Sequence, residues 1–252
     1  MIQKQTILLI TSTIQPSLNT YLLKITDPEE RLKDYEKAFY FYCSLIKSCI
    51  VSAIIYCDNS GYDLSSLKKI AEELEVLSTV EFISYKSSID TINNGRFYLE
   101  INLVKYCLDN FLFIKHSPLA TIYKVTGRYI IANIKKIISP WKNNNFDWFC
   151  NCRNYPYKWT DFYLVGFTVQ SFKKIISETM SLYEGKKDGE IILREYLDSL
   201  KNSDLKIVKR FPVTPLIKGR RGYDGGYYGQ GKDYIKYIFR SITNYVLPFI
   251  WL

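Results

Sequence analysis

The chain has 252 residues, of which 47% are hydrophobic and 23% are charged. This length and apolar content suffice for the core of one large domain and exclude a chain that is disordered throughout. The formal net charge of +9 favours anionic partners, among which nucleotide diphosphates, polyprenyl phosphates, anionic lipids and nucleic acid all qualify.

The first third of the sequence alternates compact apolar runs with segments of helical apolar spacing. Asp27 and Pro28 supply an N-cap and a proline at the first helical position, so a helix is predicted to begin there. The predicted elements, in chain order, are a strand over 6–10, a helix over 28–47, a strand over 49–57, a helix over 64–77 and a strand over 80–84. This order is typical of parallel βαβ units in an α/β domain.

The later sequence is less regular. The predictions are a turn at 93–96, a helix over 100–110, a strand over 121–125, a loop at 143–145, strands over 146–152 and 161–166, and a helix over 171–183. Residues 210–232, rich in glycine, tyrosine and arginine, are expected to form a mobile loop. We expect one domain over 1–231 and an amphipathic helical tail over 232–252, which either belongs to that domain or docks on a membrane.

Polar residues follow the predicted parallel strands, at the edge where ligands of open α/β sheets bind. The candidates at the ends of the first two strands are Thr11, Ser12, Thr13, Asp58 and Asn59. Asp58 is suited to accept hydrogen bonds from a base or a ribose, and an ordinary turn over 58–61 explains the same residues equally well.

The string from Lys124 to Tyr129 follows another predicted strand. Gly127 permits close backbone approach, and Lys124 and Arg128 are spaced to bracket a diphosphate. The alternative is a strand that ends in a glycine turn with two solvated cations.

Several short motifs together span most of the chain. They are an opening strand over 8–16, Asp58-Asn59-Ser60, Asn94-Gly95 with Glu100, Lys124-x-Thr126-Gly127-Arg128-Tyr129 with Asn133, Trp159-Thr160-Asp161, and Gly219-x-x-Gly222. In these motifs the chain resembles a group of bacterial capsule and O-antigen glycosyltransferases. It departs from that group at 94–97, where the group is richer in glycine and lysine.

The resemblance implies a single Rossmann-like domain of the GT-A type, with a mainly parallel central sheet, in a hexosyltransferase-like enzyme. Its donor would be a nucleotide-diphosphate sugar, and its acceptor a lipid-linked or growing surface polysaccharide at the inner face of the cytoplasmic membrane. Asn94 and Gly95 would belong to the donor site. Glu100 either touches the ribose or starts a helix, where its charge suits the dipole.

The sequence contains no Asp-x-Asp string, the metal signature usual in GT-A enzymes. A leaving diphosphate needs its charge neutralised by a divalent ion or by positioned cations. We therefore expect transfer without a metal cofactor, in which Lys124 and Arg128 act together with Arg220 or Arg221 closing over the phosphates. For these last two arginines an ordinary solvated loop is the alternative.

If the reaction inverts the anomeric centre, a carboxylate must accept the proton of the acceptor hydroxyl. Asp161 is the first candidate and Glu190 the second. Trp159 is a candidate to stack on the acceptor sugar. The alternative is that Asp161 caps a helix or strand and that Trp159 is an aromatic residue of the core.

Two other classes of protein fit part of the sequence. A nucleic-acid-binding protein would use the charge of +9 and the 22 tyrosines, but the basic residues are dispersed and no RRM, KH or helix-turn-helix signature is present, so no nucleic-acid partner is expected. A nucleotidyltransferase or another nucleotide-sugar enzyme is the second alternative.

The sequence also bears on location. No export signal and no apolar stretch of roughly 20 residues is visible, so we expect a cytoplasmic protein whose contact with a membrane is peripheral. Six cysteines without a CxxC pair and a single histidine, His116, argue against a Cys/His metal site and indicate a reducing compartment.

Overall fold

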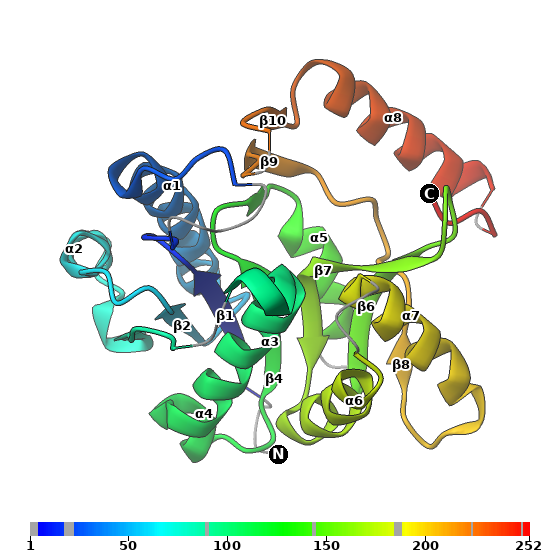
Figure 1. Ribbon diagram of the computed structural model, residues 1–252, viewed down its shortest axis with the longest axis horizontal. Coiled ribbons are helices and arrows are strands. Elements are labelled where there is room, and N and C mark those ends of the chain that lie inside the picture. The colour runs from blue at the N-terminus through cyan, green and yellow to red at the C-terminus, as the bar shows by residue number, and fades with distance from the viewer. Residues whose placement is uncertain are drawn as a thin grey trace.

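The computed structural model describes residues 5–17, 23–88, 91–142, 145–183, 188–222, 224–247 and 249–252, except for the side chains of 91–94 and 202. Within these ranges the protein is an α/β fold built on a seven-stranded sheet of order β3-β2-β1-β4-β7-β6-β8 (Figure 1). These strands are β1 (Thr6–Ser12), β2 (Ala53–Asp58), β3 (Val80–Ser84), β4 (Thr121–Thr126), β6 (Trp148–Arg153), β7 (Trp159–Phe167) and β8 (Ile207–Val208).

The first four strands of the sheet run parallel, and the direction changes beyond β4. β1 pairs in parallel with β2 and β4, and β2 pairs in parallel with β3. β7 is antiparallel to both β4 and β6, while β8 is parallel to β6. The predicted α/β fold with a mainly parallel sheet is therefore confirmed. The chain order reverses between β1 and β4, which is where ligands of open α/β sheets bind.

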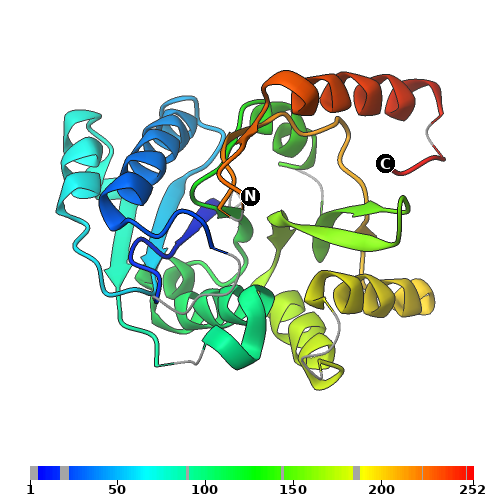
Figure 2. The ribbon, with the colours of Figure 1, turned by 45° about the horizontal axis from the view of Figure 1, so that its top comes forward.

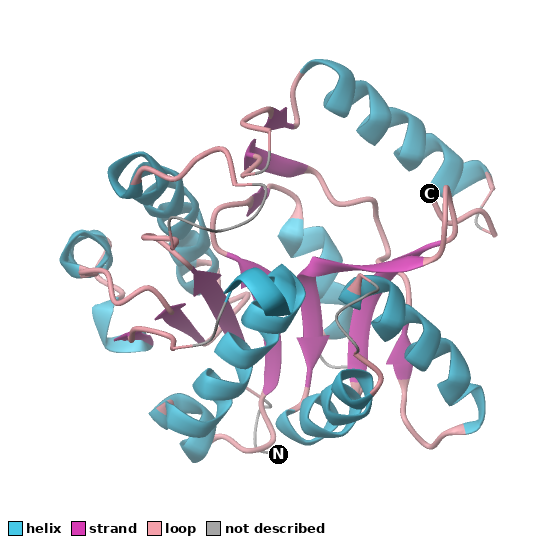
Figure 3. Ribbon diagram, viewed as in Figure 1, coloured by secondary structure: helices cyan, strands magenta, loops and turns pink. Residues whose placement is uncertain are grey.

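Helices cover both faces of this sheet (Figure 3). They are α1 (Pro28–Lys47), α2 (Ser65–Glu73), α3 (Thr91–Asn110), α4 (Leu112–His116), α5 (Ile134–Ile138), α6 (Val169–Ser181), α7 (Gly189–Ser199) and α8 (Gly231–Val246), with 3-10 turns at Leu77–Thr79, Ser139–Trp141 and Leu200–Asn202. Leu8 and Ile10 of β1 pack in the core that α1, α2 and α5 cover, whereas Ile7 and Leu9 pack in the core that α3, α6 and α7 cover. This alternation buries β1 on both faces and makes it the central support of the site.

Element boundaries differ from the sequence predictions for local reasons. Helix α1 has the predicted bounds, and Asp27 caps it by accepting the Glu30 N–H at 2.7 Å. β2 begins at Ala53 rather than at residue 49, because Cys49 takes a left-handed φ of 52° at the turn after α1. At the predicted turn of 93–96 helix α3 is kinked at Gly95, with φ 68° and ψ 165°. Residues 143 and 144 of the predicted loop at 143–145 lie outside the described residues.

The segment 210–232 has more regular structure than the sequence predicts. β9 (Ile217–Arg220) pairs antiparallel with β5 (Ile130–Ile131) and with β10 (Tyr227–Tyr228), which gives a second, three-stranded sheet. The pairing of β9 with β5 joins residues far apart in the chain, such as Ile130 and Lys218, so no local pattern reveals it.

The predicted helical tail is present as α8. It runs along one side of the molecule next to the β9–β10 hairpin (Figures 1 and 2). Most of its large apolar side chains are exposed. Among the described helices, none is long and apolar enough to cross a membrane.

Candidate functional site

A cavity of about 1280 Å³ lies at the carboxyl ends of β1 and β4. Its walls come from α3, the β6–β7 hairpin, the start of α7, the β9–β10 segment and α8. It therefore occupies the position where the strand order reverses. Within the described ranges, eight basic side chains and five carboxylates line it, so the lining is cationic when all of these groups are ionised.

The ends of β1 and β2 form a hydrogen-bonded rim of the cavity. The predicted residues that line it here are Thr11, Ser12, Thr13 and Asn59. Asp58 is fully buried behind them, and its carboxylate accepts hydrogen bonds from Ser12 Oγ at 2.8 Å, the Ile14 N–H at 2.9 Å and the Ser60 N–H at 2.8 Å. These contacts are those of a turn, so Asp58 shapes the rim rather than facing a ligand.

Lys124 is buried beneath the cavity and does not line it. Its Nζ forms an ion pair with Glu100 and donates to the Phe162 carbonyl oxygen at 2.6 Å. Burial lowers the pKa of Lys124, and the carboxylates of Glu100 and Glu190 oppose that shift. Its direct partner is therefore Glu100, and Lys124 itself is not among the residues that line the cavity.

Glu100 lies on the cavity wall, where three elements converge on its carboxylate. Its Oε1 accepts hydrogen bonds from Thr11 Oγ1 and Thr126 Oγ1, each at 3.0 Å, next to the Lys124 ion pair. The side chain is 25% exposed, and its Oε2 has no hydrogen bond to a described residue. β1, β4 and α3 thus present one carboxylate oxygen at the point where the strand order reverses.

Gly127 lets the end of β4 close against β1. Its N–H donates to the Thr11 carbonyl oxygen at 2.8 Å, and a Cβ at this position would lie 2.7 Å from that oxygen. Any larger residue would push the strand ends apart. Gly127 thereby sets where the next residue, Arg128, enters the cavity.

Arg128 is a buried cation on the cavity wall. It is 8% exposed, and its guanidinium lies 5.7 Å from the centre of the Tyr129 ring. Gly222 packs against the guanidinium so closely that a methyl group there would overlap Nη2. The Nη1 atom is buried and has no hydrogen-bond partner among the described residues. A buried guanidinium with an unused donor is a suitable site for an anion.

The two arginines of the predicted closing loop have different positions. Arg220 forms ion pairs with Glu30 and, at 3.2 Å, with Asp34 on α1, and it does not line the cavity. Arg221 does line the cavity, where Asp233 pairs with it at 2.5 Å. Only Arg221 is therefore placed near a ligand.

Two predicted donor residues belong to the first turn of α3. The side chain of Asn94 lies outside the described residues. Gly95 is exposed and forms the kink of α3, and the cavity is lined instead by its neighbours Arg96 and Phe97.

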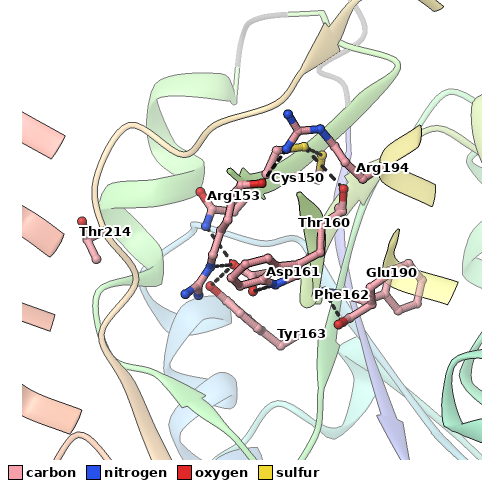
Figure 4. Close-up of polar contacts among 12 residues, drawn as sticks. Cys150, Arg153, Thr160, Asp161, Phe162, Tyr163, Glu190, Arg194 and Thr214 are labelled. Carbon is pink, nitrogen blue, oxygen red and sulfur yellow. Dashed lines mark hydrogen bonds and ion pairs between the residues drawn. The ribbon is translucent and has the colours of Figure 1, made fainter. Parts of the chain in front are cut away.

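Asp161 lies on the cavity wall at the centre of a polar cluster (Figure 4). Its Oδ2 accepts hydrogen bonds from Asn151 at 2.8 Å, Arg153 at 2.7 Å and Tyr163 at 3.3 Å, and its Oδ1 accepts one from Trp159 Nε1 at 3.2 Å. The bond to Arg153 is also an ion pair between two largely buried side chains. With both oxygens engaged, Asp161 is better placed to organise the wall than to take up a proton.

Glu190 lies next to this cluster, at the start of α7, and lines the cavity (Figure 4). Its Oε1 accepts the Phe162 N–H at 3.0 Å. The pKa of Glu190 is raised to about 8, mainly by burial and also by the nearby carboxylates of Asp161 and Asp188, while the Phe162 N–H opposes the shift. A carboxylate with a pKa near neutrality is suited to accept a proton, so the structure favours Glu190, the second candidate, over Asp161.

Trp159 lies on the same wall, beside the exposed ring of Tyr157. The two ring centres are 4.9 Å apart, and the guanidinium of Arg153 lies 5.3 Å from the Trp159 ring. Both aromatic residues line the cavity. This pair offers apolar ring surface of the kind that sugars contact.

Sequence reasoning missed several cations of the cavity. Arg31 is buried and donates to the carbonyl oxygens of Thr13 and Ile25, and Arg153 supports Asp161. Lys236 and Arg240 of α8 also line the cavity. Their helical spacing was visible in the sequence, but the side of α8 that faces the protein was not.

Asp188 caps α7 by accepting the Glu190 N–H at 3.0 Å. In the described ranges no three His, Cys, Asp or Glu side chains gather as a metal site. The six cysteines are free thiols.

No protein-family model and no curated protein matches the sequence. Solved structures with a similar course of the chain include the galactosyltransferase LgtC in complex with donor and acceptor sugar analogs, at 7% identity and TM-score 0.49, over 81% of this chain and 72% of that one. A protein assigned as a glucose-1-phosphate thymidylyltransferase from Bacillus anthracis, in complex with a sucrose, has 12% identity and TM-score 0.47 over 86% and 89% of the two chains. The glycosyltransferase GlyE from Streptococcus pneumoniae has 9% identity and TM-score 0.44 over 82% and 45%. The likeness is one of fold.

Proposed function

We propose that this chain is a glycosyltransferase that moves a sugar from a nucleoside diphosphate donor to a surface-polysaccharide acceptor. The observation that carries the proposal is the buried guanidinium of Arg128, which lines the cavity at the carboxyl ends of β1 and β4 with its Nη1 unpartnered among the described residues. An unsatisfied buried polar group costs about 1–3 kcal/mol, more when it is charged. A diphosphate oxygen would supply the missing partner of Nη1 in a charge-assisted hydrogen bond.

The rim at the ends of β1 and β2 offers further contacts for the donor. Thr11, Thr13 and Asn59 offer polar side chains to the nucleoside. The open Oε2 of Glu100 is placed to accept a hydrogen bond from a ribose or sugar hydroxyl. The donor would thus lie across the ends of β1, β2 and β4, as in other open α/β sheets.

The acceptor would bind against the opposite wall, with its sugar on Trp159 and Tyr157. In an inverting transfer, Glu190 takes the proton of the acceptor hydroxyl while that oxygen bonds to the anomeric carbon and the bond from this carbon to the diphosphate breaks. Its raised pKa suits this role near neutral pH.

We propose that cations stabilise the departing diphosphate without a divalent metal. Arg128 and Arg221 both line the cavity. Gly222 packs against the guanidinium of Arg128, and Asp233 forms an ion pair with Arg221, so both cations are held in place. Transfer should persist in EDTA. Complete loss with EDTA that Mn²⁺ reverses would overturn this part of the proposal.

We propose further that the outward face of α8 docks on an anionic membrane surface, which would bring the cavity to a lipid-linked acceptor. The exposed apolar stripe consists of Ile235, Ile238, Phe239, Ile242 and Val246, with Tyr234 and Tyr245 along one edge. Lys232 lies at the other edge, and aromatic and basic rims of this kind suit the headgroup boundary.

Liposome co-sedimentation tests the docking. The triple variant Ile235→Ser/Phe239→Ser/Ile242→Ser should lose binding to vesicles with phosphatidylglycerol. Leu119→Ser, which alters a more exposed apolar residue elsewhere, should retain it. Equal binding of the triple variant and the wild type would refute the docking, as would a wild-type dimer that dissociates in the triple variant.

The central proposal is tested by binding of UDP, GDP and dTDP, measured by calorimetry. At least one should bind, and Arg128→Ala should weaken it by about 10- to 100-fold, the loss of a charged hydrogen-bonded contact. Lys68→Ala on α2, an exposed cation remote from the cavity, is the control. No binding of any nucleotide, or equal affinity in Arg128→Ala, would refute the proposal.

A further inference from the structure

Helix α8 is tied to the body of the protein at both ends. At its start, Asp233 pairs with Arg221 at 2.5 Å. Near its end, Asn244 accepts a hydrogen bond from Arg210 and donates to Thr214 Oγ1 at 2.5 Å. Beyond the helix, the Trp251 carbonyl oxygen accepts the Asn154 N–H at 2.7 Å. These ties orient α8, so one defined face of the helix is turned toward the cavity.

The face turned toward the cavity is polar. The residues of α8 that line the cavity are Asp233, Lys236, Tyr237, Arg240 and Asn244, at the i, i+3, i+4, i+7 and i+11 positions of one stripe. The exposed apolar stripe lies on the opposite side of the same helix. α8 is therefore two-sided, with hydrocarbon facing outward and charge facing inward.

The two cations of this inward face have little compensation from carboxylates. Asp233 is engaged by Arg221, and Lys236 lies at 3.7 Å from its other oxygen. Arg240 has no hydrogen bond or ion pair with a described residue. Burial lowers the pKa of Arg240, and the nearby cation Arg153 lowers it further, while Asp161, Tyr163 and Asp233 oppose the shift.

On the facing wall of the cavity, the carboxylate that acts on Arg240 is that of Asp161. Asp161 is already saturated by Arg153, Asn151, Trp159 and Tyr163. Lys236 and Arg240 are one helical turn apart, so their charged groups can converge on one ligand. Two such cations face a wall on which Asp161 already has its hydrogen-bond partners. They are therefore suited to bind a phosphate group.

This second cationic site is separate from Arg128. Arg128 packs against Tyr129 and Gly222 at the end of β4, whereas Arg240 faces Arg153 and Asp161 on the β6–β7 side. The wall that Arg240 faces carries Trp159, and Glu190 lies next to it. An anion bound by α8 would thus lie on the acceptor side of the reaction.

We infer that Lys236 and Arg240 bind a phosphate or diphosphate group of the acceptor, next to the sugar that receives the transferred residue. This inference rests on the proposed function. It explains why α8 carries cations inward and hydrocarbon outward: a lipid diphosphate has an anionic group that belongs in the cavity and a chain that belongs in the membrane against which the outer face would lie. A soluble sugar phosphate presents the same anionic chemistry without the chain.

The test uses the whole chain, with a saturating concentration of whichever nucleoside diphosphate binds, so that the donor site is filled. Binding of inorganic pyrophosphate, of a short-chain lipid diphosphate sugar and of a soluble sugar 1-phosphate is then measured by calorimetry. Lys236→Ala/Arg240→Ala should weaken binding of these anions by about tenfold or more. Lys68→Ala on α2, which removes an exposed cation outside the cavity lining, should leave it unchanged.

The outcomes separate this inference from the proposed function. Nucleotide affinity should be unchanged in the α8 double variant and reduced in Arg128→Ala. If the wild type binds nucleotide, but the wild type and the Lys236→Ala/Arg240→Ala variant have equal affinity for these anions, the inference alone would be overturned. Failure of every nucleotide to bind would overturn the proposed function itself. Of the two acceptor ligands, tighter binding of the lipid diphosphate sugar identifies the membrane source, and tighter binding of the sugar 1-phosphate identifies the soluble one.

Discussion

The substitution Glu190→Gln probes the chemical step most directly. A pKa of about 8 leaves roughly one Glu190 side chain in ten ionised at pH 7. Because only the carboxylate accepts a proton, wild-type kcat/KM should rise with pH through about 8 and reach a plateau about tenfold above its value at pH 7. Glutamine keeps an oxygen for the Phe162 N–H but cannot act as a base, so the plateau should fall by about 10²–10⁴-fold and the rise should disappear.

The assay is initial-rate transfer measured from pH 5.5 to 9.5, with Glu195→Gln on the exposed side of the same helix as the control. Thermal unfolding should show that the variant remains folded. Because the pKa of Glu190 is raised in the folded state, its contribution to stability is present at low pH and lost as the pH rises through about 8. Glu190→Gln should therefore gain stability relative to wild type at pH 9. A variant that keeps the rise near pH 8 would refute the assignment of the base.

Three further substitutions test how the site is built. Lys124→Ala should lower the free energy of unfolding by about 3–5 kcal/mol in urea titrations, because it leaves Glu100 without its ion-pair partner. A loss of nucleotide binding with unchanged stability would contradict this structural role of Lys124. Gly127→Ala should cost about 1–3 kcal/mol in the same assay, because its Cβ would overlap the Thr11 carbonyl oxygen, and unchanged stability would show that the strand ends can separate. Asp161→Asn should lower the melting temperature, because it leaves Arg153 without its ion-pair partner. It should also move the pH profile of transfer to lower pH, because it removes a charge that raises the pKa of Glu190. A pH profile that does not move would exclude this effect of Asp161 on Glu190.

The order of elements and the edge of the sheet that holds the site could be predicted from the sequence. The α1 boundaries follow from Asp27 and Pro28, whose effects are local to one helical turn. The ends of β1 and β4 were expected at one crevice because parallel strands end on the same edge, and Thr11 and Arg128 do meet there. The β5–β9 pairing and the inward face of α8 depend on contacts between distant segments, and no local pattern contains them.

The chemistry of individual residues shows the same division. The sequence by itself determined that Lys124 and Arg128 flank a strand end, since strand propensity and a glycine turn act over a few residues. Only the tertiary structure decided that Lys124 lies under the sheet edge against Glu100 while Arg128 enters the cavity. It also gave Asp161 and Glu190 different surroundings: donors from β6 and β7 saturate the first carboxylate, and burial beside Asp161 raises the pKa of the second. Proton affinity depends on solvent exclusion and on charges brought close by folding, and these arise only when residues far apart in the chain pack together.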